Sequence, residues 1–80
     1  MTIVERVIKC ITAKIGTPIN NITRRSHLQN DLCADSLDIL MIRLEIENEF
    51  GITFTNEELK NMLTVDSICT TIEKREDYRK

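Results

Sequence analysis

Residues 31–38 read Asp-Leu-Cys-Ala-Asp-Ser-Leu-Asp, and a largely apolar run follows from 39 to 50. This order predicts a polar loop that ends at Asp35 and a long helix that begins at Ser36. The first N–H groups of a helix lack intrahelical partners and lie at the positive end of its dipole, so a phosphate is well tolerated there. Ser36, flanked by Asp35 and Asp38, therefore suits covalent attachment of a phosphate-linked group by another enzyme.

A serine near a helix start also has a simpler explanation, because Ser, Thr, Asn and Asp are the preferred N-cap residues. Asp35 can cap the helix beside a modified Ser36, so the two explanations are compatible. The run Asp-Leu-x-Ala-Asp-Ser-Leu-Asp, about thirty-five residues into a chain of 80, resembles the acyl carrier proteins, and the resemblance extends from Ile3 to Ile72. It implies that Ser36 carries 4′-phosphopantetheine, whose terminal thiol holds acyl chains as thioesters.

Length and composition favour one small helical domain, residues 1–80. A chain of this size buries only about 60–65% of the surface that its unfolded form exposes. Hydrophobic residues make up 41% of the chain, which has no Trp, two Gly and one Pro. So few turn residues argue against a sandwich of many short strands. We therefore predict an all-α fold, a small four-helix bundle with three longer helices and a short third one.

Apolar residues at helical spacing, together with capping and stop signals, predict where the helices lie. Thr2 and Thr55 each precede a glutamate by three residues, which is capping-box spacing, and Gly16 and Gly51 follow the two longest apolar stripes. The expected helices are 3–15, 36–50, 56–62 and 65–76. A long loop, about 17–35, separates the first two, with core anchors expected at Ile19, Ile22, Leu28 and Leu32. The charged tail, 74–80, is expected to fray.

The net charge of −2 conceals a strong asymmetry along the chain. Residues 1–30 hold five Lys or Arg against one acid, 31–58 hold eight acids against Arg43 alone, and 59–80 hold five bases against four acids. The acidity is concentrated around Ser36 and the helix after it, which attracts basic partner surfaces and repels nucleic-acid phosphates. A merely solvated helix face gives the same pattern.

Cys10, Cys33 and Cys69 are odd in number and widely spaced, and with a single histidine they form no zinc site of a usual spacing. We expect reduced thiols in a cytoplasmic protein, two of them in the core. No apolar run is long enough to span a membrane, and no signal peptide is expected. The adjacent pair Arg24-Arg25 is expected to be solvated rather than to bind nucleic acid.

The helix at 36–50 carries two rows, both interpreted as core that faces more than one neighbour. One consists of Leu37, Leu40, Leu44 and Glu47, and the other of Ile39, Ile42, Ile46 and Phe50. Through the resemblance, apolar residues of the last three helices would also enclose an acyl chain, and the acidic surface would dock partner enzymes. The expected acyl-pocket residues are Ile39, Ile42, Ile46, Phe54, Leu59, Met62 and Ile72. The expected docking residues are Asp35, Leu37, Asp38, Met41, Glu45, Glu47 and Glu49.

Three departures from the family pattern stand out. Cys33 occupies the position where the family usually has Gly, and a cysteine there is strained if the position needs a positive φ. Met41 and Arg43 stand where carriers of fatty-acid synthesis tend to be acidic or small and apolar, which predicts weaker or different partner choice. Phe54 and Leu59 are bulky for an acyl pocket, which predicts a short or altered cavity.

No catalysis is expected, because the sequence has no Cys–His pair, metal constellation or glycine-rich phosphate loop. The resemblance implies a phosphopantetheinyl transferase and acyl-loading, elongating or acyl-transferring enzymes as partners. A monomer is expected, on the argument that no apolar residues are left over for an interface.

The leading hypothesis is a carrier for fatty-acid or related lipid synthesis. A carrier for peptide or polyketide assembly stays open, as does an unmodified helical interaction module in which Ser36 is a simple cap. A nucleic-acid-binding bundle is disfavoured because the best helix is acidic.

Overall fold

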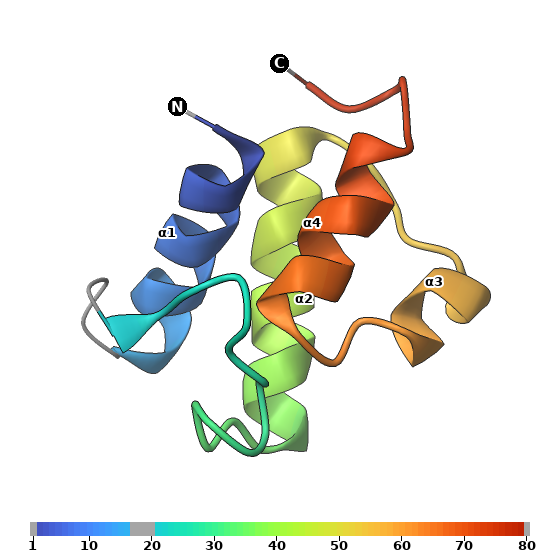
Figure 1. The fold of residues 1–80 in the computed structure, drawn as a ribbon. Helices are drawn as coiled ribbons and strands as arrows, with labels where there is room; N and C mark the ends of the chain where they lie inside the picture. Colours follow the sequence, from blue (N-terminus) through green and yellow to red (C-terminus); the bar gives the residue numbers. More distant parts are fainter. Residues whose placement is uncertain (1, 17–20, 80) are drawn as a thin grey trace.

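The computed structural model describes residues 2–16 and 21–79, which form an all-α fold, as predicted. Figure 1 shows the longest helix in the middle and the shortest one set apart, and the first helix packs against both the longest and the last one. No strand occurs within the described residues, only an isolated bridge between His27 and Thr64. The helices are α1 (Ile3–Ile15), α2 (Ser36–Phe50), α3 (Asn56–Lys60) and α4 (Val65–Glu73).

Local signals fix the ends of α1 and α2, and both predicted ranges are confirmed. At the start of α1 the side chains of Thr2 and Glu5 each accept the other's backbone N–H, at 3.1 and 3.2 Å. Gly16 and Gly51 end the two helices in the left-handed conformation, with φ of 70° and 66°. A residue with a Cβ adopts that conformation only at a cost, so these two glycines are effective stop signals.

The core lies where α1, α2 and α4 meet. A capping box between Thr55 and Glu58 starts α3 as predicted, yet α3 buries none of its residues, and its Leu59 is only partly buried against the core. The large side chains that are fully buried come from the three longer helices, and they are Val7, Ile11, Ile42, Ile46, Phe50, Val65, Ile68, Cys69 and Ile72.

One of the two apolar rows on α2 is exposed rather than buried, so its interpretation as core is wrong. The apolar residues of this helix are not confined to one side, and α1 covers only part of its circumference. The premise that no apolar residues remain for an interface is therefore also wrong. The exposed fractions in this row are 62% for Leu37, 41% for Leu40 and 50% for Leu44, and Met41, which adjoins the row, is 37% exposed.

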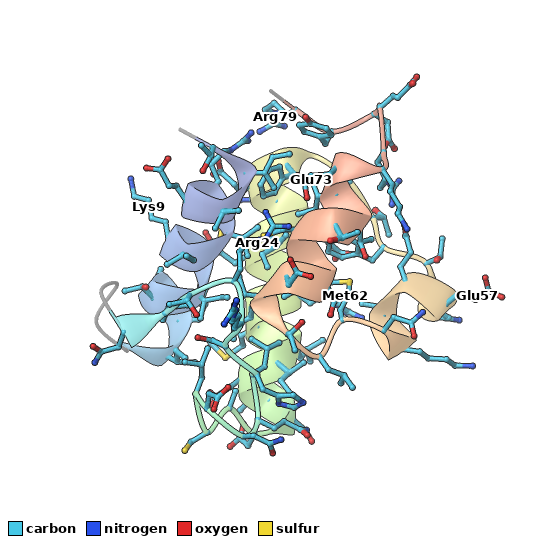
Figure 2. All side chains as sticks on the ribbon, viewed as in Figure 1. Lys9, Arg24, Glu57, Met62, Glu73 and Arg79 are labelled. Atoms are coloured by element: carbon cyan, nitrogen blue, oxygen red, sulfur yellow. The ribbon has the colours of Figure 1, made fainter. Side chains whose placement is uncertain are left out.

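The long loop is joined to the start of α4. Leu28 N–H donates to the carbonyl of Leu63, and Val65 N–H donates to that of Ser26, both at 3.0 Å. Arg24 is solvated as predicted, with 39% of its side chain exposed, and it also pairs at the surface with Asp66 at 2.7 Å and Glu73 at 3.2 Å. Figure 2 labels Arg24 and Glu73. The two carboxylate partners of Arg24 hold its pKa above the usual range. Of the predicted anchors, Ile22 and Leu28 are buried, Leu32 is partly buried, and Ile19 lies outside the described residues.

The last two helices are shorter than predicted. After α4 ends at Glu73, the N–H of Arg75 donates to the carbonyl of Ile72 at 3.0 Å, a 3₁₀-type hydrogen bond at the helix end. The segment that follows is packed rather than frayed, at least as far as residue 79. Arg75 donates to the carbonyl of Thr53 at 2.9 Å and pairs with Glu58 at 3.1 Å. Tyr78 lies edge-on to Phe50, with ring centroids 6.1 Å apart. These contacts hold the chain end against the far end of α2.

Candidate functional site

Ser36 is the first residue of α2, and it does not cap the helix. The cap is Asp35, whose Oδ1 accepts the N–H of Asp38 at 2.8 Å. Asp38 returns the interaction by accepting the N–H of Asp35 at 3.3 Å. Ser36 itself is exposed, and no group in the described part of the chain hydrogen-bonds to its hydroxyl. The capping explanation therefore applies to Asp35 and leaves the serine oxygen available for chemistry.

The turn that delivers Ser36 to the surface depends on Cys33. This residue has φ of 56°, the left-handed conformation that favours glycine. The next residue, Ala34, is buried, and its N–H donates to the carbonyl of Leu28 at 2.9 Å. The backbone therefore reverses at Cys33 and is anchored at Ala34 before the helix begins. The expectation that Cys33 is strained if its position needs a positive φ applies here.

The electrostatics at the start of α2 combine two opposing effects. The helix dipole favours an anion there by about 0.3–1 kcal/mol, while Asp35 and Asp38 repel one. Both carboxylates are engaged with backbone N–H groups on the capping side of the turn. A phosphate joined to Ser36 can therefore extend into solvent, where water screens its repulsion from the two carboxylates.

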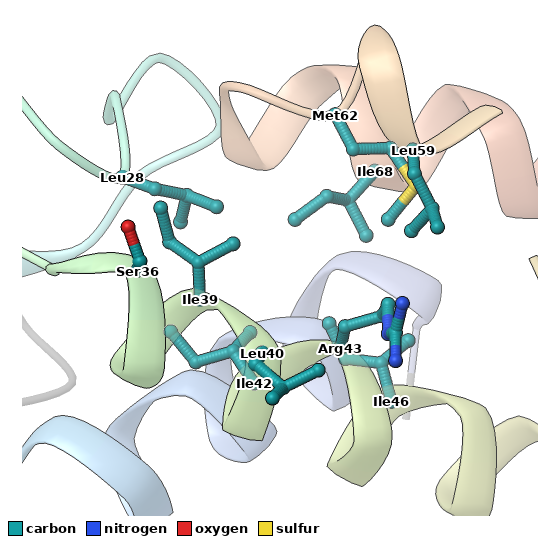
Figure 3. Close-up of a pocket in the computed structure, with 10 residues that line it drawn as sticks. All are labelled: Leu28, Ser36, Ile39, Leu40, Ile42, Arg43, Ile46, Leu59, Met62 and Ile68. Carbon is teal, nitrogen blue, oxygen red and sulfur yellow. The ribbon is translucent and has the colours of Figure 1, made fainter. Parts of the chain in front are cut away.

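A cavity of about 230 Å³ opens beside Ser36, between α2, α3, α4 and the long loop (Figure 3). Its walls are aliphatic except for Ser36 and Arg43. The lining residues are Leu28, Ser36, Ile39, Leu40, Ile42, Arg43, Ile46, Leu59, Met62 and Ile68.

The predicted pocket residues divide into two groups. Ile39, Ile42, Ile46, Leu59 and Met62 line the cavity, whereas Phe54 and Ile72 are buried in the core outside it. Phe54 therefore does not shorten the cavity. The sequence reasoning missed Leu28, Leu40, Arg43 and Ile68 as lining residues. For Leu40 and Arg43 a signal existed, because they follow Ser36 by four and seven residues and so share its face of the helix.

The predicted docking acids are not equivalent. Glu45 pairs with Lys14 at 3.3 Å and Glu49 pairs with Arg6 at 3.0 Å, both across the contact with α1. Glu47 accepts the N–H of Phe54 at 2.8 Å. Asp35 and Asp38 lie at the start of the helix beside Ser36. Leu37 belongs to the exposed apolar row, and the exposed Met41 adjoins it.

Comparison with known proteins shows which family this chain belongs to. Residues 5–72 match the protein family described as “Phosphopantetheine attachment site”. The chain belongs to this family. It is 40% identical over 70 residues to the acyl carrier protein of Buchnera aphidicola subsp. Baizongia pistaciae (strain Bp), covering 88% of this chain and 90% of the relative. It is 34% identical over 73 residues to that of Thermotoga maritima (strain ATCC 43589 / DSM 3109 / JCM 10099 / NBRC 100826 / MSB8), covering 91% and 90%.

A phosphopantetheine carrier related to the acyl carrier proteins is a non-catalytic protein that other enzymes modify and load. Its prosthetic group, 4′-phosphopantetheine, supplies a thiol that holds acyl groups as thioesters. The residues present fit such a group, since the exposed Ser36 hydroxyl, which has no hydrogen-bond partner among residues 2–16 and 21–79, lies beside an apolar cavity. The described residues include no cluster of potential metal ligands and no helix long and apolar enough to cross a membrane.

Proposed function

We propose that Ser36 bears the 4′-phosphopantetheine arm and that the chain carries acyl intermediates to enzymes of fatty-acid or lipid synthesis in the cytoplasm. The observation that carries the proposal is the Ser36 hydroxyl, which is exposed, unbonded and next to the cavity mouth. In the modification, Ser36 Oγ attacks the pantetheine-side phosphorus of coenzyme A, and a phosphodiester forms. The phosphoanhydride bond breaks, adenosine 3′,5′-bisphosphate leaves, and the transferase takes the serine proton.

Docking of the transferase and the acyl-processing enzymes is assigned to the start and exposed row of α2. Asp35 and Asp38 would meet basic side chains, while Leu37 and Met41 would meet an apolar surface. Exposed ion pairs contribute only about 0–1 kcal/mol each, which suits fast and reversible docking. Glu45, Glu47 and Glu49 remain candidates, but docking through them has to compete with Lys14, Arg6 and the N–H of Phe54.

The apolar cavity is proposed to shelter the acyl chain. Each methylene removed from water stabilises the sheltered state by roughly 0.8 kcal/mol. We expect the carrier to be a monomer, since an apolar row that serves successive partners has to stay accessible.

Incubation with a phosphopantetheinyl transferase and coenzyme A tests the proposal. We expect a mass gain of one phosphopantetheinyl group, absent in Ser36→Ala. Ser67→Ala is the matched control, because Ser67 also lies in the first turn of a helix but is hydrogen-bonded to Thr64 at 2.7 Å. It should retain the full gain. No gain under conditions that modify a known carrier would leave the unmodified interaction module instead.

A carrier for peptide or polyketide assembly is the second candidate, and Arg43 in the cavity wall favours it. Loading separates peptide assembly from the first function. Acceptance of malonyl groups from a fatty-acid malonyl transferase supports the first function over a carrier for peptide assembly. Acceptance of aminoacyl groups from an adenylating enzyme, with no malonyl loading, supports the second.

A further inference from the structure

The cavity wall contains one charged side chain, Arg43, and its Nε–H has no acceptor. The Nε atom is buried and makes no hydrogen bond within the described residues. Glu47 Oε1 lies 4.0 Å from it, close enough for electrostatic attraction but beyond hydrogen-bonding distance. Glu47 is held in place by the N–H of Phe54, at 2.8 Å from its other carboxylate oxygen. The donor is therefore left unpaired by the way its neighbour is fixed.

An unpaired donor in this position disfavours a purely aliphatic guest. A buried N–H on a charged group loses its hydration, and surrounding it with methylenes provides no replacement acceptor. An oxygen atom at hydrogen-bonding distance restores the lost interaction, and a charge-assisted hydrogen bond is roughly twice as strong as a neutral one. The wall therefore selects for oxygen at this depth in the cavity.

The position of Arg43 defines how such a guest would lie. Arg43 follows Ser36 by seven residues, two helical turns along the same face, or about 10 Å along the axis. Figure 3 shows Ser36 at one end of the cavity and Arg43 towards the other, facing Leu59 and Met62. The cavity volume of about 230 Å³ is below the roughly 300–1,000 Å³ of pockets that enclose drug-sized ligands. A guest that enters beside Ser36 and reaches Arg43 is thus short.

We propose that this carrier shelters short acyl groups that bear a keto or hydroxyl oxygen, and that Arg43 donates a hydrogen bond to that oxygen. The inference rests on the proposed carrier function of Ser36. A neutral oxygen is favoured over a carboxylate, because Glu47 already places a negative charge 4.0 Å from the same nitrogen. Arg43 thereby becomes a determinant of cargo specificity.

Thioester protection tests this inference. The holo-protein is loaded with hexanoyl, 3-oxohexanoyl, 3-hydroxyhexanoyl or 5-oxohexanoyl groups, and cleavage by hydroxylamine is followed by mass spectrometry. Each rate is divided by the rate for the same thioester on free pantetheine, which removes intrinsic reactivity. We expect at least one oxygenated chain to be protected several-fold more than hexanoyl. This advantage should disappear in Arg43→Met, which keeps an unbranched side chain as far as the position of Nε but has no donor.

Arg25→Met is the matched control, since Arg25 is exposed on the loop and does not line the cavity. It should keep the wild-type order of protection. The far-ultraviolet circular dichroism of Arg43→Met should match that of the wild type, and the ¹⁵Nε–¹H signal of Arg43 should shift on loading an oxygenated chain but not hexanoyl.

The outcomes distinguish a failure of the role proposed for Arg43 from a failure of the carrier function proposed for Ser36. Hexanoyl protected as well as every oxygenated chain, or an advantage that persists in Arg43→Met, overturns the inference and leaves the carrier function intact. Failure of Ser36 to accept the arm at all overturns both.

Discussion

At the scale of single residues, the conformation of Cys33 has a measurable energetic consequence. Its φ of 56° destabilises the folded state of an L-residue by about 1–2 kcal/mol, and glycine removes this cost. Glycine also lowers the free energy of the unfolded chain by about 0.4–1 kcal/mol, because that chain gains conformational entropy. We therefore expect Cys33→Gly to raise the free energy of unfolding by roughly 0.5–1 kcal/mol, measured by urea denaturation. Cys33→Ala is the control for loss of the thiol. A Cys33→Gly protein no more stable than Cys33→Ala would contradict the assignment of strain.

The three thiols should differ sharply in reactivity. Burial raises the pKa of the Cys10 and Cys69 thiols from 9.0 to about 11, whereas Cys33 is exposed. Because the thiolate is the reactive form, iodoacetamide at pH 8 should add one group to the native protein and three to the urea-unfolded one. In Cys33→Ala the native protein should add none.

The same shifts give stability a defined dependence on pH. Unfolded thiols ionise at lower pH than the buried ones, so the contribution from Cys10 and Cys69 is complete below pH 9 and is lost as the pH rises towards 11. Rapid labelling of two or more thiols in the native protein at pH 8 would contradict the burial of Cys10 and Cys69.

At the scale of elements, the capping and docking roles of Asp35 can be separated. Asp35→Ala removes the cap of α2 and should cost about 0.5–2 kcal/mol of stability. Asp35→Asn keeps a good cap but removes the charge, so stability should stay near that of the wild type while the kcat/KM of the transferase falls, most clearly at low salt. Urea denaturation measures the stability of both variants, and the rate of arm transfer measures the docking of the transferase.

Thr64→Ala is the control for capping alone. Thr64 caps α4 by accepting the N–H of Ser67 at 3.1 Å. Its loss should lower stability without slowing arm transfer. If Asp35→Asn transfers as fast as the wild type at every salt concentration, the Asp35 carboxylate has no part in docking.

The element boundaries also show what a sequence can and cannot predict. The limits of α1 and α2 were predictable because Thr2, Asp35, Gly16 and Gly51 act within one turn of the chain. The end of α4 was not, since no Gly or Pro follows Glu73. Long-range pairing was also invisible. Arg24 binds residues 42 and 49 positions away, which no local pattern encodes.

The features of the site also divide into those that local sequence predicts and those that depend on the tertiary fold. The position of Ser36 at a helix start was predictable from the motif, and its exposure is consistent with the expected attachment. The exposure of Leu44 was not predictable, because apolar periodicity identifies faces but not how many neighbours cover them. The cavity likewise draws on Leu28 and Ile68, which only the tertiary fold brings together.

At the scale of the whole molecule, stability and docking should respond to different residues. A domain of 80 residues is stable by about 4–12 kcal/mol, so Ile72→Ala in the core, at about 2–5 kcal/mol, removes a large share of it. Leu44→Ser on the exposed row should change stability by less than about 0.5 kcal/mol yet slow arm transfer. Urea denaturation and transferase kinetics on both variants check this. Equal transferase kinetics in Leu44→Ser and the wild type would exclude the apolar row from docking.

The loose packing of α3 against the core affects the lengths of acyl chain that the cavity can hold. Because none of its residues is buried, moving α3 away from α2 exposes little apolar surface, and the three longer helices keep their packing. The part of the wall formed by Leu59 can therefore yield to a chain too long for the resting cavity, at the expense of one small element, whereas Met62 follows α3 and is buried in the core. Amide hydrogen exchange should accordingly quicken over residues 57–60 as the carried chain lengthens, while Ile42 and Ile68 keep the protection of the unloaded protein. The ability of the cavity wall to adapt to a longer acyl chain is thus confined to α3.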